Sequence, residues 1–143
     1  MLLRSLTIMI ICLMSFSAIS QTSGDKNQIL SLMQEQEIAW NKGDLIGFMQ
    51  GYWKNDSLMF IGKSGITYGW QQTLTNYQKG YPDTASMGKL NFTILEALPL
   101  SKKYFHVVGK WHLARSKGDL QGHFTLLFQK IKGKWYIIKD HSS

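Results

Sequence analysis

Residues 29–40, ILSLMQEQEIAW, decide the fold, because their apolar residues recur at the spacing of one helical face. At 3.6 residues per turn, that face carries Ile29, Leu32, Met33, Gln36, Ala39 and Trp40. Gln36 is the one polar member of the stripe. A buried amide needs hydrogen-bond partners or an adjoining cavity. We therefore predict a helix that covers a pocket, with Gln36 facing into it.

The segment before this helix has the pattern of a secretory signal peptide. A basic start at Arg4 precedes an apolar run over residues 6–16, and Ala18 and Ser20 supply the small residues of a cleavage site. We expect residues 1–20 to be removed and the protein to be exported, either to the periplasm or by secretion, without stable membrane insertion. The alternative is an uncleaved anchor, but the apolar run is short for a transmembrane span.

The remaining domain, residues 21–143, is long enough for one hydrophobic core. Cys12 is the only cysteine and lies in the signal segment, so no disulfide or thiol chemistry is expected in this domain. The chain has a formal net charge of +7, and its lysines are scattered along the sequence. Nucleic-acid-binding surfaces usually cluster their positive charge, so no nucleic-acid partner is expected.

Helices come first along this domain, and a run of strands follows. Gly43 is expected to end the first helix, and Asp44 to cap the second. The other expected elements are helices over 45–53 and 70–80 and strands over 57–62, 66–68, 89–98, 104–115, 120–131 and 135–141. Residues 83–88 are expected to be a loop. The order predicts an α+β fold, with helices packed on a strongly curved antiparallel sheet.

A two-residue turn at Lys117-Gly118 would fix the register of the two longest strands. Trp111 would then face Phe124 on the apolar side of the sheet. On the other side, His112 would face His123.

Asp140 and His141 form the sharpest polar pair, because an imidazole or a carboxylate can serve as acid or base. Neighbours on a strand point to opposite faces, so only one of them can enter the pocket without a bulge. A two-residue turn at residues 132–133 would put His141 opposite Phe124, and a one-residue slip would instead turn Asp140 inward. The alternative is that both residues cap a frayed strand.

Several short motifs occur in an order that is typical of one superfamily. They are AWNKGDL at 39–45, the Tyr52-Trp53 pair, Asp56, TYGW at 67–70, YPDTASMG at 81–88, VVGKW at 107–111, GHFTLLF at 122–128 and WYIIKDHSS at 135–143. On these motifs, residues 27–143 resemble the nuclear transport factor 2-like (NTF2-like, or SnoaL-like) superfamily, and within it the secreted branch of the domain of unknown function 4440. The resemblance implies a cone-shaped α+β barrel with one deep pocket and frequent homodimerisation through the outer sheet face.

Ketosteroid isomerases share that fold, and the resemblance allows their catalytic positions to be compared with this chain. The isomerase tyrosine falls at Gln36, and the aspartate base falls at Ile61. Isoleucine cannot accept a proton. Gln36 is therefore interpreted as a hydrogen-bonding ligand contact rather than a catalyst.

Aromatic residues from most of the expected elements are predicted to surround the pocket with a few polar groups. The predicted ligand-binding residues are Gln36, Trp40, Tyr52, Trp53, Phe60, Trp70, Tyr77, Trp111, Arg115 and Phe124. The alternative for most of the rings is simple core packing.

No metal or cofactor is expected. His112 and His123 could seed a metal site with Asp140, but histidines on a half-exposed sheet face are more often surface or interface residues. No glycine-rich phosphate loop and no nucleophilic serine motif occur in the sequence.

We predict a domain that binds a small apolar or aromatic molecule. One alternative is an enzyme of isomerase, cyclase, dehydratase or hydrolase type on a small organic substrate. It would use Asp140 or His141, with Gln36, Tyr52 and Arg115 as polar partners. The other alternative is a homodimeric interaction module without a ligand.

Overall fold

The computed structural model describes residues 23–143, and the expected signal peptide over residues 1–20 lies outside the described residues. The first helix covers residues 23–41. Gly43 follows with a φ of 78°, which ends the helix as predicted. Within the described part of the chain, no helix combines the length and apolar character needed to cross a membrane.

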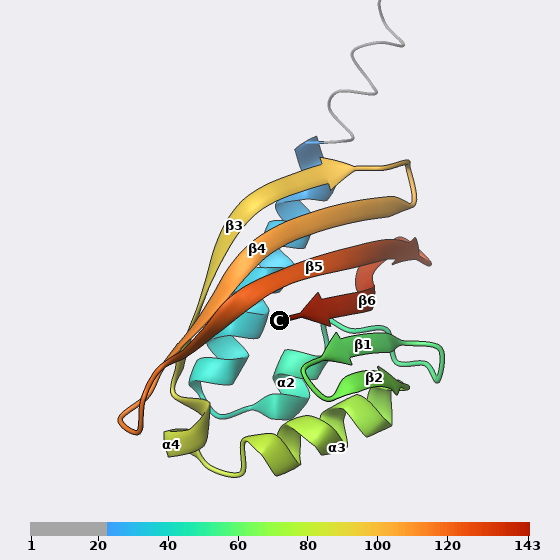
Figure 1. Cartoon of the computed structure of the whole chain (residues 1–143). Coiled ribbons are helices and arrows are strands. Elements are labelled where there is room, and N and C mark those ends of the chain that lie inside the picture. Colours follow the sequence, from blue (N-terminus) through green and yellow to red (C-terminus); the bar gives the residue numbers. More distant parts are fainter. Residues whose placement is uncertain (1–22) are drawn as a thin grey trace, which may run out of the picture.

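Six strands form one strongly curved sheet in the order β2-β1-β6-β5-β4-β3 (Figure 1). Their bounds are β1 Met59–Gly62, β2 Gly65–Tyr68, β3 Lys89–Pro99, β4 Tyr104–Ala114, β5 Leu120–Ile131 and β6 Lys134–Ser142. Neighbouring strands are antiparallel except β1 and β6, which run parallel. The predicted α+β architecture, with helices packed on a strongly curved and mostly antiparallel sheet, is confirmed.

Three shorter helices complete the fold. They are α2 Leu45–Met49, α3 Trp70–Gly80 and α4 Thr84–Met87. Helices α2 and α3 lie beside β1 and β2, and α4 lies next to the start of β3 (Figure 1). Asp44 caps α2 as predicted, since its carboxylate accepts a hydrogen bond from the Gly47 amide at 2.8 Å. The helix is shorter than predicted, because the Trp53 amide instead donates to Ile137 of β6 at 2.9 Å.

The expected loop over residues 83–88 is wrong, because this stretch contains α4. Asp83 caps that helix by accepting a hydrogen bond from the Ser86 amide at 2.6 Å. Gly88 ends it with a φ of 62°, a conformation that favours glycine.

The predicted pairing of β4 with β5 has the correct face but the wrong register. Trp111 lies opposite Gly122, and Phe124 lies opposite Gly109. The shift of two residues arises because the connection is longer than a two-residue turn. Asp119 closes this connection by accepting a hydrogen bond from the Arg115 amide at 3.0 Å.

An irregularity in the pairing of β5 with β6 decides which of Asp140 and His141 faces inward. Phe128 pairs with Ile137, but Leu127 pairs with Lys139, so Ile138 is an extra residue. The bulge turns Asp140 to the concave face, where it is 4% exposed. The expected position of His141 opposite Phe124 is wrong, because the bulge places His141 opposite Thr125.

An ion pair fastens the first helix to the sheet. The Asp25 carboxylate accepts hydrogen bonds from Lys130 of β5 at 2.7 Å and from the Trp135 indole of β6 at 3.2 Å. The Lys130 ammonium also lies 5.6 Å from the centre of the Trp135 ring.

Candidate functional site

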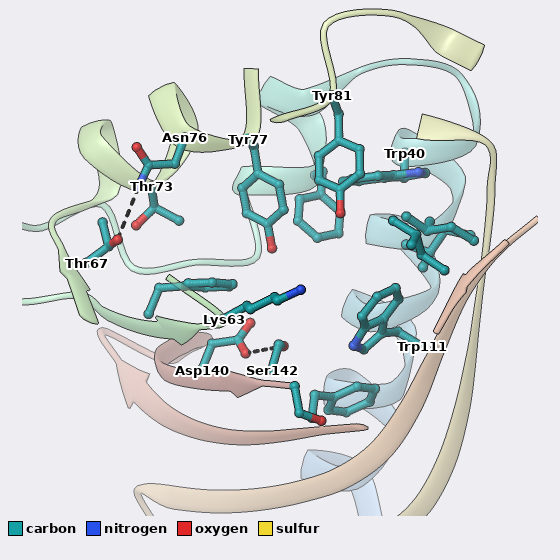
Figure 2. Close-up of a pocket in the computed structure, with 18 of the residues that line it drawn as sticks. Trp40, Lys63, Thr67, Thr73, Asn76, Tyr77, Tyr81, Trp111, Asp140 and Ser142 are labelled. Atoms are coloured by element: carbon teal, nitrogen blue, oxygen red, sulfur yellow. Dashed lines mark hydrogen bonds between the residues drawn. The ribbon is translucent and has the colours of Figure 1, made fainter. Parts of the chain in front are cut away.

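A cavity of about 600 Å³ lies between the helices and the concave face of the sheet (Figure 2). This volume is within the range typical of small-molecule sites. The lining consists of Gln36, Trp40, Phe48, Tyr52, Phe60, Gly62, Lys63, Ser64, Gly65, Thr67, Thr73, Asn76, Tyr77, Tyr81, Leu90, Phe92, Trp111, Leu113, Leu120, Gln121, Phe124, Leu126, Asp140, Ser142 and Ser143.

Aromatic rings from the helices form one wall of this cavity. Trp40 is at its centre, with ring-centre distances of 5.1 Å to Phe48, 5.9 Å to Tyr77 and 4.9 Å to Tyr81. These pairs are edge-to-face, the arrangement that aromatic quadrupoles favour. The Trp40 indole nitrogen donates to the Met87 carbonyl oxygen at 3.1 Å, which fixes the ring. The wall is therefore preorganised.

The sheet forms the opposite wall, through side chains of β3, β4 and β5. The Phe92 and Phe124 rings pack edge-to-face at 5.5 Å. Trp111 also lines the cavity, and Figure 2 shows its indole nitrogen on the side of Ser142 of β6. The Trp111 indole nitrogen is buried and has no hydrogen-bond partner among the described residues.

Asp140 is the one acidic residue among those that line the cavity. Its carboxylate oxygens accept hydrogen bonds from the Tyr52 hydroxyl and the Ser142 hydroxyl, both at 2.7 Å. Burial raises the pKa of the Asp140 carboxyl from its ordinary value of 3.8 to about 6, and the two hydrogen bonds and the nearby His141 limit the rise. A group with this pKa can donate or accept a proton near neutral pH.

Two phenols near Asp140 stay protonated over the physiological range. The pKa of Tyr52 and the pKa of Tyr77 are both raised well above 10.0, chiefly by burial and then by the Asp140 charge. Each therefore offers a neutral O–H group, and the Tyr52 hydroxyl is already committed to Asp140.

Gln36 lies in the cavity lining, and the structure also gives its amide a structural contact. The side chain is 3% exposed, and its nitrogen donates to the Phe48 carbonyl oxygen at 3.1 Å. Gln36 therefore links the first helix to α2. On β1, Phe60 lines the cavity, whereas Ile61 is not among the lining residues.

Seven of the ten predicted ligand-binding residues lie in the cavity lining, and three lie elsewhere. The Trp53 backbone amide donates to the Ile137 carbonyl oxygen of β6, and Trp53 does not line the cavity. Trp70 is buried and donates to the Met49 carbonyl oxygen at 2.8 Å, so it packs in the core. The Arg115 side chain donates to the Gly118 carbonyl oxygen at 2.7 Å and to the Ser86 carbonyl oxygen of α4 at 3.4 Å, and it does not line the cavity.

The histidines do not meet at a metal site. The expected pairing of His112 with His123 is wrong, because the longer turn brings His112 within 2.9 Å of Asp119 instead. His141 is exposed and lies on the strand face opposite to Asp140. Among residues 23–143, no cluster of acidic, histidine or cysteine side chains has the makings of a metal site.

Sequence reasoning missed several lining residues. Phe48 and Phe92 lie on the faces of α2 and β3 that line the cavity, so helical and strand periodicity could have identified them. Tyr81 ends α3 with its ring against Trp40, a contact that depends on where the helix stops. Lys63 lies in an exposed hairpin turn, and no local signal shows that its side chain turns inward.

Comparison with known proteins shows close likeness only to solved structures. No protein-family model and no curated protein matches the chain. An NTF2-like protein of unknown function from Shewanella oneidensis MR-1 is 49% identical, with a TM-score of 0.79. That match covers 82% of this chain and 97% of the other.

More distant structures share the fold. An NTF2-like superfamily protein from Salmonella enterica serovar Typhimurium LT2 is 19% identical, with a TM-score of 0.68 over 85% of this chain and 92% of that one. A ketosteroid isomerase-like protein from Erwinia carotovora atroseptica is 14% identical, with a TM-score of 0.64 over 83% of this chain and 95% of that one. At such identities the likeness concerns the fold alone.

Proposed function

This chain belongs to the NTF2-like family, and within that fold we propose that it binds a flat, largely apolar small molecule in the cavity. The observation that carries the proposal is the preorganised aromatic cavity with a buried polar cluster, Asp140 with Tyr52 and Ser142. Fold alone does not assign a function in a family with many activities, so the proposal depends on the site.

The two walls define the shape of the ligand. Rings centred on Trp40 face rings centred on Phe124, so a planar molecule would gain apolar contact on both sides. The polar groups near Asp140 favour a ligand with a hydroxyl or carbonyl group. A hydroxyl can donate a hydrogen bond to the Asp140 carboxylate, and a carbonyl oxygen can accept one from the neutral Tyr77 hydroxyl. Aromatic ketones and phenols have this combination.

Ligand retention and a defined probe test the proposal together. Mass spectrometry of molecules released from the purified protein identifies what it carries. Nuclear magnetic resonance with 2-acetonaphthone, a flat aromatic ketone, should shift the amide signals of lining residues such as Phe124 and Asp140. Gln36→Leu should weaken the binding of 2-acetonaphthone several-fold, because it removes an amide from the lining.

Gln34→Leu is the matched control, since Gln34 is exposed on the same helix and should bind the probe like the wild type. A binding function would be contradicted if 2-acetonaphthone shifted only the amide signals of residues on the outer surface and the purified protein released no bound molecule. The domain would then be the interaction module considered from its sequence.

Proton transfer is a second candidate, and Asp140 favours it. A buried carboxyl with a pKa of about 6, in contact with a protonated phenol, has the properties of a general base paired with a hydrogen-bond donor. Asp140 would take a proton from a carbon next to a ligand carbonyl and return it, with no other bond broken.

Deuterium exchange into the methyl group of 2-acetonaphthone measures that step. The wild type should exceed the buffer rate by about 100-fold, and the rate should rise with pH and level off above about 6 as Asp140 ionises. Asp140→Asn should return to the buffer rate, while Asp119→Asn, an exposed acid, should not. Equal rates in the wild type and Asp140→Asn exclude this chemistry for ketones.

A further inference from the structure

We propose that the ligand carries an anionic oxygen group, such as a carboxylate, held between the Lys63 ammonium and the Trp111 indole N–H. This inference rests on the proposed binding function and specifies its ligand class. Two donors from different elements support it, Lys63 from the turn between β1 and β2 and Trp111 from β4.

The Trp111 indole is a donor without an acceptor. Its nitrogen is buried and makes no hydrogen bond within the described chain, although buried indole N–H groups usually find a partner. Leaving such a donor unpaired is unfavourable, because it has lost its hydrogen bond to water and gained none in the protein. An acceptor oxygen on a bound molecule would remove that cost, so the orphaned N–H favours a ligand that supplies one.

Lys63 is the one cationic side chain among the described residues that line the cavity. No ion pair or hydrogen bond holds the ammonium within residues 23–143. Figure 2 shows it turned into the cavity, toward the space that the Trp111 nitrogen and the Ser142 hydroxyl also border. An inward cation without a counter-charge favours an anion over a neutral acceptor.

Asp140 does not supply that counter-charge. Both of its oxygens already accept hydrogen bonds, from Tyr52 and Ser142, and Lys63 is not among the charges that influence its pKa. The Asp140 carboxylate is therefore satisfied by its own hydrogen-bond donors, whereas the Lys63 ammonium has no negatively charged partner. The formal charge of +7 on the chain would also attract an anionic ligand over longer distances.

Calorimetric titration with two probes of matched shape tests the inference. One probe is 2-naphthoate, which is ionised at neutral pH, and the other is the neutral 2-acetonaphthone. The wild type should bind 2-naphthoate about tenfold more tightly. Lys63→Met should abolish that preference, with a larger loss of affinity for 2-naphthoate than for 2-acetonaphthone, and Lys63→Arg should restore the preference because it keeps the positive charge.

Trp111→Phe keeps an aromatic ring and removes the N–H. It should weaken both probes by about fivefold, because each has an acceptor oxygen. Lys102→Met is the matched control. Lys102 lies in the turn between β3 and β4 and does not line the cavity, so this variant loses the same charge at another site.

The outcomes of these titrations distinguish a preference for an anionic ligand from cavity binding in general. Equal affinity for the two probes, or equal losses in Lys63→Met and Lys102→Met, overturns the anionic ligand and leaves cavity binding intact. Binding of neither probe overturns both. An unchanged affinity in folded Trp111→Phe overturns the role of the indole, and near-ultraviolet circular dichroism confirms the fold of each variant.

Discussion

Asp140 reduces the stability of the fold at neutral pH, because its charge is held in an aromatic cavity. Tyr52 and Ser142 stabilise the carboxylate, yet burial outweighs them and the pKa rises to about 6. The folded protein therefore holds this proton more tightly than the unfolded chain does. Natural proteins retain such groups chiefly at functional sites, which is why Asp140 is central to both candidate functions.

Asp140→Asn should stabilise the protein, and the gain should depend on pH. Between about pH 4 and pH 6 the wild type releases a proton on unfolding, so its stability falls as the pH rises. Above the folded pKa the full cost remains, and a change in pKa from 3.8 to about 6 corresponds to roughly 3 kcal/mol. Denaturant unfolding of both proteins at about pH 4 and pH 8 measures the difference.

The control for this titration is Asp56→Asn, because Asp56 is exposed and its side chain makes no hydrogen bond or ion pair within the described part of the chain. A gain for Asp140→Asn that is the same at both pH values would show that the carboxyl has an ordinary pKa. The cavity end of β6 would then be hydrated rather than desolvated.

Among the elements, the close packing of β4 against the Phe124 ring of β5 depends on one glycine, Gly109. Gly109 lies opposite Phe124, and an added Cβ would meet the Phe124 ring and lie 2.7 Å from the Thr93 carbonyl oxygen. The ring therefore covers the glycine backbone and forms part of the cavity wall. A side chain at residue 109 would push that wall into the cavity.

Gly109→Ala should destabilise the protein by about 1–3 kcal/mol, the range typical of an overpacked core, and should weaken binding of 2-acetonaphthone. Unfolding in denaturant and calorimetric titration measure the two effects. Gly80→Ala is the control, because an added Cβ there meets nothing within 4 Å. Full stability of Gly109→Ala would show that Phe124 can move without cost.

For the whole molecule, the outer face of the sheet is the remaining unassigned surface. Strand alternation places all four histidines there, together with Leu127, because their neighbours Phe105, Leu113, Phe124, Leu126 and Asp140 are buried on the other face. The family resemblance implies a homodimer through this face, and a second copy of the chain would cover these side chains.

Analytical ultracentrifugation should therefore give the mass of a dimer. Leu127→Glu should shift it to the monomer, because the new charge would be desolvated in the interface. In the monomer that charge would lie beside His106 and Lys139, so it should not disturb the fold. Ile46→Glu should leave the dimer intact, because Ile46 lies on α2 and is already 56% exposed. A monomeric wild type would contradict the expected assembly.

Local chemistry is sufficient to predict most of the elements. Gly43 and Asp44 mark the end of one helix and the start of the next, and the stripe through Ile29, Met33 and Trp40 identifies the buried face. The candidate aromatic residues follow from the same periodicity, because a side chain's face depends on its place within its own helix or strand. These features need no information from distant parts of the chain.

The sequence by itself thus determined the α+β class, the helix that carries Gln36 and most of the cavity rings. Only the tertiary structure decided the strand registers, the bulge at Ile138, and with it the inward direction of Asp140 and the outward direction of His141. The same holds for Lys63, whose turn gives no local sign of facing the cavity. Register depends on the length of each turn and the packing of several strands at once, and a shift of one residue reverses every side chain.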